Sequence, residues 1–307
     1  MTVIVRTLAD LRAITTGWRR DGKTSAVVPT MGALHGGHLT LVREGKKRAD
    51  KCVATIFVNP SQFAPTEDLS RYPRDEDDDL RLLKSVKCDL AYIPSPDEIY
   101  PAGFATAVAP SGPALAGLED KFRPHFFGGV ATVVAKLFNQ TGCDFAMFGE
   151  KDYQQLQVVT RMARDLDIAI EVVGVPTVRE ADGLAMSSRN RYLSHVERQR
   201  ATAIYRALSD AAEKIGNGIK PSIATAAVRR TLTTQGFRVD YVAARHASTL
   251  AVTENTDDPI RLIAAAWIGN TRLIDNVAVV KKAPQPASPP APATAARTRV
   301  KIVRAKE

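Results

Sequence analysis

Short apolar runs alternate with longer stretches of helical periodicity in the first half of the chain. The apolar runs have the length and the Val, Ile, Ala and Phe content of buried strands. They are Ser25–Pro29, Cys52–Val58, Leu90–Ile93, Phe145–Phe148 and Val172–Val178. The stretches between them predict helices at His38–Asp50, Asp75–Ser85, Gly129–Gln140 and Tyr153–Leu166. This alternation predicts an α/β fold with an open, twisted parallel sheet.

The pattern predicts a first unit over residues 1–176 and a smaller α+β unit over residues 177–282. In the second unit the periodicity predicts two helices and then two strands. They are His195–Ile215, Pro221–Gln235, Phe237–Ala243 and Ile260–Ile268. The segment Ala283–Pro292 contains five prolines, so residues 283–307 are predicted to form a disordered, basic tail.

The net charge of +9 is concentrated at the C-terminal end. After Val280 there are seven basic residues and one acidic residue, so this end carries +6 and the first 280 residues carry only +3. A nearly neutral body argues against a specific nucleic-acid-binding protein.

Other features of the sequence bear on its location. No apolar run reaches the roughly 18–20 residues that a membrane span needs, and the N-terminus lacks the pattern of a signal peptide. Three widely separated cysteines indicate neither a disulfide framework nor a zinc site. We therefore expect a cytoplasmic enzyme without membrane contact.

A Gly-containing segment follows the strand that ends at Pro29. It reads Met31-Gly32-Ala33-Leu34-His35-Gly36-Gly37-His38. Free N–H groups at a helix start attract phosphate, and the i, i+3 spacing places both imidazoles on one helix face. The segment therefore predicts nucleotide binding. A metal site and a simple capped helix start are the alternatives.

Three further polar segments follow predicted strands or lie in a loop. Gly149-Glu150-Lys151-Asp152-Tyr153-Gln154-Gln155 supplies a cation and amides, and Met186-Ser187-Ser188-Arg189 combines hydroxyls with a guanidinium. Phe57–Phe63 contains Gln62, and the acidic run Asp75–Asp79 follows it. Each segment alone could be an ordinary polar loop, and the acidic run could either hold Mg²⁺ or favour a helix start.

Together the motifs PTMGALHGGH, FVNPSQF, YPR, FGEKDYQQL and GLAMSSRNRYLS resemble the pantothenate synthetase family over residues 1–282. The resemblance implies a Rossmann-like ATP-binding domain, a smaller C-terminal domain that closes over the site, and a homodimer. It also implies the condensation of pantoate with β-alanine through a pantoyl-adenylate, with ATP as co-substrate and Mg²⁺ as cofactor. The products would be pantothenate, AMP and pyrophosphate.

The resemblance also assigns roles to individual residues. His38, His35 and Lys151 are the expected catalytic residues, and Gln62 and Gln155 the expected pantoate contacts. Gln62 is also expected near β-alanine, and Asp78 and Asp79 near Mg²⁺ on the ATP phosphates. The expected ATP contacts are Met31, Gly32, Ala33, Leu34, His35, Gly36, Gly37, His38, Gly149, Glu150, Lys151, Asp152, Val178, Met186, Ser187, Ser188 and Arg189.

One segment departs from the family pattern Arg-Pro-Gly-His-Phe-x-Gly-Val. Here Phe126 stands at the usual His position and His125 at the usual Gly. His125 is therefore not among the expected catalytic residues, whereas Arg123 is an expected contact.

Two other functions compete with this interpretation. A transferase of the same group that moves a nucleotide onto a phosphate-bearing substrate should have extra basic residues; the amides of Gln62 and Gln155 suit a hydroxyl and a carboxylate better. A nucleic-acid-binding protein would have to rely on the basic tail alone.

Deletion of residues 283–307 should leave synthetase activity and thermal stability nearly unchanged. Prolines exclude regular helix or inner strand from Ala283–Pro292, and exposed basic side chains contribute little to stability. Activity assays and thermal melts of the intact and shortened chains check this expectation. A melting temperature several degrees lower would contradict it.

Overall fold

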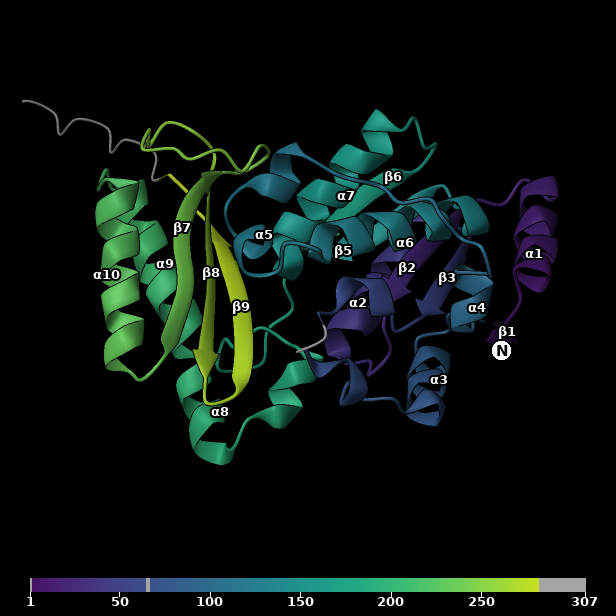
Figure 1. Cartoon of the computed structure of the whole chain (residues 1–307), viewed down its shortest axis with the longest axis horizontal. Helices are drawn as coiled ribbons and strands as arrows, with labels where there is room; N and C mark the ends of the chain where they lie inside the picture. Colours follow the sequence, from purple (N-terminus) through teal and green to yellow (C-terminus); the bar gives the residue numbers. More distant parts are fainter. Residues whose placement is uncertain (1, 65–66, 282–307) are drawn as a thin grey trace, which may run out of the picture.

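Six parallel strands form the larger of two sheets (Figure 1). The computed structural model describes residues 2–64 and 67–281. The strands run in the order β1-β4-β3-β2-β5-β6, and their pairings are all parallel. They are β1 (Val3–Val5), β2 (Ser25–Thr30), β3 (Lys51–Ile56), β4 (Leu90–Tyr92), β5 (Phe145–Gly149) and β6 (Glu171–Val175). The predicted α/β class with a parallel sheet is confirmed.

Helices cover both faces of this sheet. They are α1 (Leu8–Arg20), α2 (Gly36–Arg48), α3 (Glu76–Ser85), α4 (Pro96–Ile99), α5 (Glu119–Phe122), α6 (Phe126–Thr141) and α7 (Tyr153–Asp165). Val27 of β2 belongs to a core cluster with residues of α1, α6 and α7, whereas its neighbours Ala26 and Val28 pack with residues of α2 and α3. Successive strand residues face opposite sides, so covering both faces requires the continuous apolar run seen in the sequence.

The smaller sheet is antiparallel and stands beside the larger one (Figure 1). It consists of β7 (Arg238–His246), β8 (Ile260–Ile268) and β9 (Thr271–Ala278), and the helices of this half are α8 (His195–Ala201), α9 (Ala203–Gly216) and α10 (Pro221–Thr234). Residues of α9 and α10 share a core cluster with one face of the sheet. Tyr241 and Ile263 on the other face pack with Leu118, next to α5.

Several element boundaries differ from the predicted ones. Helix α2 begins at Gly36 rather than at His38, and His35 is its N-cap. The predicted helix His195–Ile215 is divided at Thr202 into α8 and α9. Strand β6 ends at Val175 because Pro176 follows it.

The sequence pattern did not predict β1, α1, β9 or the four-residue helices α4 and α5. Strand β1 has only three residues, and the amphipathic helix α1 contains Gly17, a weak helix former. Strand β9 contains the buried polar residues Asp275 and Asn276, which interrupt its apolar pattern. In each case the local sequence pattern indicates the helix or strand only weakly, and packing against the rest of the chain stabilises it.

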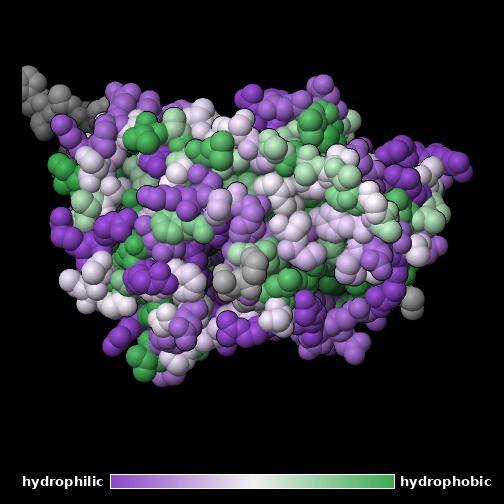
Figure 2. Space-filling view, viewed as in Figure 1, coloured by the Kyte–Doolittle hydropathy of each residue, from purple (hydrophilic) through white to green (hydrophobic). Residues whose placement is uncertain are grey.

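Hydrophilic and hydrophobic residues are interspersed on the face shown in Figure 2. No helix in the described part of the chain is both long enough and apolar enough to cross a membrane. The expected tail, residues 283–307, lies outside the described residues.

A buried carboxylate holds the loop that leads from β2 into α2. Asp79 in the first turn of α3 accepts the backbone N–H groups of Ala33, at 3.0 Å, and Leu34, at 2.7 Å. Gly32 has a φ of 80°, and a Cβ there would lie 2.8 Å from Asp79 Oδ2. The close approach of Asp79 therefore requires a glycine at this position.

Replacement of Asp79 by Ala should lower the free energy of unfolding by about 1–3 kcal/mol, because two buried N–H groups lose their acceptors. The control is Asp77→Ala, since Asp77 is exposed in the same helical turn. Urea denaturation measures both variants. Equal stability of the two would contradict the assigned role of Asp79.

Candidate functional site

The site lies where four neighbouring strands end. The strands β3, β2, β5 and β6 are adjacent and parallel, so the loops that follow them meet at one edge of the sheet. Ligands of open α/β sheets bind at this edge. Three segments with the candidate chemistry follow Thr30, Ile56 and Gly149 directly, and Met186–Arg189 lies in the longer connection after Val175.

These loops enclose a cavity of about 210 Å³. Among the expected site residues, its lining comprises Met31, His35, Gly37, His38, Gln62, Gly149, Lys151, Asp152, Gln155, Val178, Met186, Ser187, Ser188 and Arg189. A larger cleft of about 1030 Å³ extends toward the small sheet and shares Gln62, Lys151 and Gln155 with the cavity. The two spaces therefore adjoin, and we call the one at the strand ends the inner cavity and the larger one the outer cleft.

The remaining expected ATP contacts do not line either space. Gly32, Ala33 and Leu34 are buried residues of the loop between β2 and α2. Glu150 faces the small sheet, where its Oε2 lies 2.9 Å from Arg261 Nη2. A Cβ on Gly36 would lie 3.0 Å from Met186 Sδ, so this glycine allows Met186 to pack on the start of α2.

The two histidines lie close together at the start of α2. Their ring centroids are 4.1 Å apart, and His35 Nδ1 accepts the N–H of Gly37 at 3.1 Å. His38 Nδ1 is buried and has no hydrogen-bond partner among the described residues. The pair therefore offers imidazole nitrogens to a ligand that enters the cavity.

Both histidines are neutral at pH 7. Burial lowers the pKa of His35 to about 3, with further lowering by His38 and Lys151. Burial and then Lys151 lower the pKa of His38 to about 4. An anionic ligand would counteract the effect of Lys151 on both pKa values, because it adds negative charge beside the rings.

The small sheet positions the turn that contains Lys151. Asn276 Nδ2 of β9 donates to the carbonyl oxygens of Glu150, at 2.8 Å, and Lys151, at 2.9 Å. The Nζ atom of Lys151 lies 3.6 Å from Asp152 Oδ2, and its side chain is 20% exposed. The ammonium group therefore remains available to a second anion.

Neighbouring glutamines at the start of α7 have different surroundings. Gln154 is buried, accepts the N–H of Glu119 and donates to the Pro113 carbonyl and Asp120. Gln155 is partly exposed and lines both spaces. Gln154 thus supports the fold, whereas Gln155 is placed for a ligand.

Gln62 is held from two sides. Its Oε1 accepts from Asn59 Nδ2 at 3.1 Å, and its Nε2 lies 3.1 Å from Met31 Sδ. Sulfur is a weak acceptor, so an oxygen of a ligand could replace it as the partner of the amide.

The serines of the Met186–Arg189 segment organise its backbone. Ser188 Oγ donates to the Ala33 carbonyl at 2.9 Å, and Ser187 Oγ accepts the N–H of Arg189 at 3.3 Å. The first bond ties this segment to the loop before α2. The two segments predicted to bind phosphate, Met31–His38 and Met186–Arg189, are therefore joined by a hydrogen bond.

The carboxylates of the acidic pair are engaged with other groups of the protein. Asp79 uses both carboxylate oxygens for loop N–H groups, and burial raises its pKa. Asp78 pairs with Arg81. Across residues 2–64 and 67–281, no cluster of three or more His, Cys, Asp or Glu side chains could hold a metal ion.

The residues that hold the site from β8 and β9 were not predicted from the sequence. Arg261 and Asn276 contact the Lys151 turn, and Asp275 pairs with Arg179, with contacts of 2.7 and 2.9 Å. The sequence feature that could have identified these residues is the pair of polar residues, Asp275 and Asn276, inside the apolar strand β9. Asp275 is 4% exposed and Asn276 1% exposed, and buried polar groups require partners.

The solved structures similar to this chain include pantothenate synthetases and a pantoate–β-alanine ligase. The enzyme of Thermus thermophilus superposes with a TM-score of 0.85 at 47% identity, over 91% of this chain and 99% of that chain. A pantoate–β-alanine ligase of Francisella tularensis, in complex with Beta-gamma ATP and β-alanine, has a TM-score of 0.76 at 31% identity. That match covers 91% of this chain and 98% of that chain.

Curated relatives are similar over nearly their whole length. Pantothenate synthetase 2 of Bradyrhizobium diazoefficiens is 56% identical over 278 residues, which cover 90% of this chain and 98% of the relative. The pantothenate synthetase of Rhodopseudomonas palustris strain BisB18 is 57% identical with the same coverage. The model of the family described as pantoate-beta-alanine ligase matches residues 3–278, and the chain therefore belongs to that family.

Proposed function

We propose that the chain activates pantoate with ATP to form pantoyl-adenylate and pyrophosphate, and then transfers the pantoyl group to β-alanine with release of AMP. Family membership supports pantothenate as the product. The observation that carries the rest is the inner cavity, where two neutral histidines and Lys151 meet two glutamines.

In the first step a carboxylate oxygen of pantoate attacks the α-phosphorus of ATP, and the bond to the bridging oxygen breaks. Negative charge builds on the departing pyrophosphate. Lys151 supplies a positive charge, and His38 and His35 can donate N–H hydrogen bonds to phosphoryl oxygens. Preorganised donors of this kind stabilise the transition state because they need no rearrangement.

In the second step the amine of β-alanine attacks the adenylate carbonyl. The bond from that carbon to the AMP oxygen breaks, and the amine loses a proton as the amide forms. The mixed anhydride also reacts with water. The outer cleft between the two sheets would limit that side reaction by enclosing the intermediate.

The glutamines give the site its preference for pantoate. An amide offers both a donor and an acceptor, which suits a hydroxyl group next to a carboxylate. Gln155 and Gln62 come from different strand ends and line the same cavity. Gln62 also lines the outer cleft, which suits its expected position near β-alanine.

The other expectations from the resemblance remain part of this proposal. Residues 1–176 would bind ATP and pantoate, and residues 177–282 would cover the site. Mg²⁺ would accompany the ATP phosphates, with Asp78 and Asp79 near it. The chain would act in the cytoplasm as a homodimer. Incubation with ATP, Mg²⁺, pantoate and β-alanine tests the activity when AMP and pantothenate are both measured.

Replacement of His38 by Ala should slow pantoyl-adenylate formation about 10²- to 10³-fold, since one preorganised donor is lost. Single-turnover measurement with ATP and pantoate checks the rate. The control is His195→Ala, because His195 is exposed on α8 and contacts Gln199 outside the cavity. A normal rate for the His38 variant would refute its role.

Replacement of Gln155 by Ala should weaken pantoate binding by about 0.5–1.5 kcal/mol through loss of a neutral hydrogen bond. ATP affinity should be unchanged. Gln157→Ala is the matched control, because Gln157 lies on the same helix and lines neither space. Calorimetric titration that showed weaker ATP binding and unchanged pantoate binding would reverse the assignment.

A further inference from the structure

Arg123 presents a guanidinium group at the wall of the outer cleft. It lines that cleft and not the inner cavity, and its side chain is 16% exposed. Arg123 Nη2 donates to the carbonyl oxygen of Gln62 at 3.2 Å. Since Gln62 lines both spaces, the guanidinium lies next to the passage between them.

The aromatic ring of Phe126 supports this guanidinium. The Arg123 Cζ atom lies 3.8 Å from the ring centroid, and Phe126 is 8% exposed. A cation above an aromatic face is attracted to it, most strongly where water is excluded. The family departure at position 126 therefore provides an apolar support for the arginine, which leaves its N–H groups for carboxylates.

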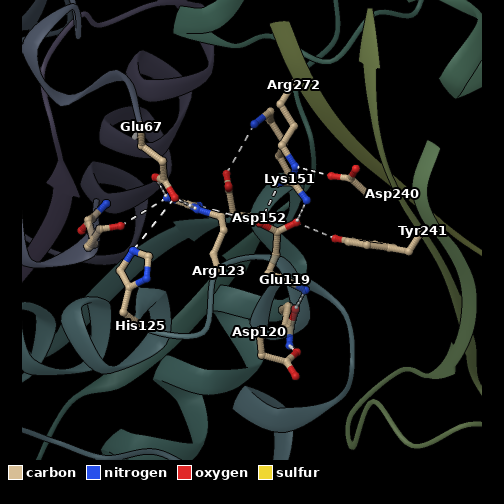
Figure 3. Close-up of polar contacts among 12 residues, drawn as sticks. Glu67, Glu119, Asp120, Arg123, His125, Lys151, Asp152, Asp240, Tyr241 and Arg272 are labelled. Carbon is tan, nitrogen blue, oxygen red and sulfur yellow. Dashed lines mark hydrogen bonds and ion pairs between the residues drawn. The ribbon is translucent and has the colours of Figure 1, made fainter. Parts of the chain in front are cut away.

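Two carboxylates lie on either side of Arg123 (Figure 3). Glu119 is buried and is already bonded to Tyr241, at 2.8 Å, and Arg272, at 2.8 Å; its Oε2 lies 3.7 Å from Arg123 Nη1. Glu67 makes the closer, two-pronged contact with Arg123, at 2.9 and 2.6 Å. Its side chain is 21% exposed, against 8% for Glu119.

Of the two carboxylates, Glu67 can be exchanged. It lines the outer cleft, and besides Arg123 its carboxylate lies near His125, whose Nε2 atom is 4.0 Å from Glu67 Oε1. Removing one partner of a partly buried ion pair leaves an uncompensated charge, which is unfavourable. A second carboxylate can take the place of Glu67 and keep the guanidinium paired, whereas a neutral molecule cannot. The released Glu67 carboxylate is the more exposed of the two and can be hydrated.

We propose that Arg123 recognises the carboxylate of β-alanine, and that Glu67 stays paired with the Arg123 guanidinium until β-alanine binds. The inference rests on the proposed function. The carboxylate of pantoate must reach the inner cavity to react with ATP, so it is not the group at Arg123. The carboxylate of β-alanine lies at the opposite end from its reacting amine, which matches an arginine just outside the inner cavity.

Two variants of Arg123 and Glu67 test the proposal. Arg123→Lys keeps the charge and removes the fork that binds a carboxylate through two hydrogen bonds. It should raise the KM for β-alanine roughly 10- to 100-fold, the equivalent of one charge-assisted hydrogen bond. Glu67→Gln should lower that KM, because a neutral amide competes less well for the guanidinium.

Hydroxylamine provides the control substrate, because it attacks the adenylate to give a hydroxamate and AMP but carries no carboxylate. Its KM should be the same in the wild-type chain and both variants. Arg6→Lys and Glu76→Gln are matched control variants, since this Arg–Glu pair lies on the exposed surface away from both spaces. Their KM for β-alanine should equal that of the wild type.

Pyrophosphate release with ATP and pantoate alone separates the two proposals. Its absence in the wild-type chain would refute the proposed function. Normal release, with an unchanged KM for β-alanine in Arg123→Lys, would refute the inference alone. An equal rise in the KM for hydroxylamine would also refute it, because the effect would then be a general distortion. An unchanged or raised KM for β-alanine in Glu67→Gln would refute the proposed displacement of Glu67 from Arg123.

Discussion

The side-chain amide of Asn276 is the contact on which the site depends most directly. It lies in the small sheet, is 1% exposed, and donates to two carbonyl oxygens in the turn after β5 of the large sheet. Buried amide N–H groups that lack acceptors cost about 1–3 kcal/mol. The turn and β9 are therefore held in one relative position, and with them the Lys151 ammonium and the cleft between the sheets.

The electrostatic character of the inner cavity follows from this arrangement. One lysine lies beside two imidazoles that burial keeps neutral. The described residues thus bring the charges of Lys151 and Arg189 into a space whose lining contains one carboxylate, that of Asp152. A polyphosphate would supply the missing negative charge, and partial removal of water would strengthen its attraction to Lys151.

The sequence predicted the parts of the molecule whose local pattern agrees with their final environment. Strands β2, β3 and β5 are continuous apolar runs, and the polar residues after them converge because parallel strands end at the same edge. The prediction failed for β9, because Asp275 and Asn276 are unfavourable in a buried strand unless they have hydrogen-bond partners. Those partners come from distant segments of the chain. The sequence also did not distinguish Asp78 from Asp79, because the two residues have the same side chain. Only their positions on α3 relative to the sheet place one beside Arg81 and the other beneath the loop before α2.

The bonds from Asn276 also have a consequence for unfolding. The small sheet has its own core with α9 and α10, which would ordinarily allow it to melt separately. Arg261 and Asn276 of this sheet, however, find their partners in the turn after β5. Separate melting of either half would leave these groups without partners in the other half. The two sheets are therefore coupled into one cooperative unit, and local opening of the lysine turn requires β9 to open with it.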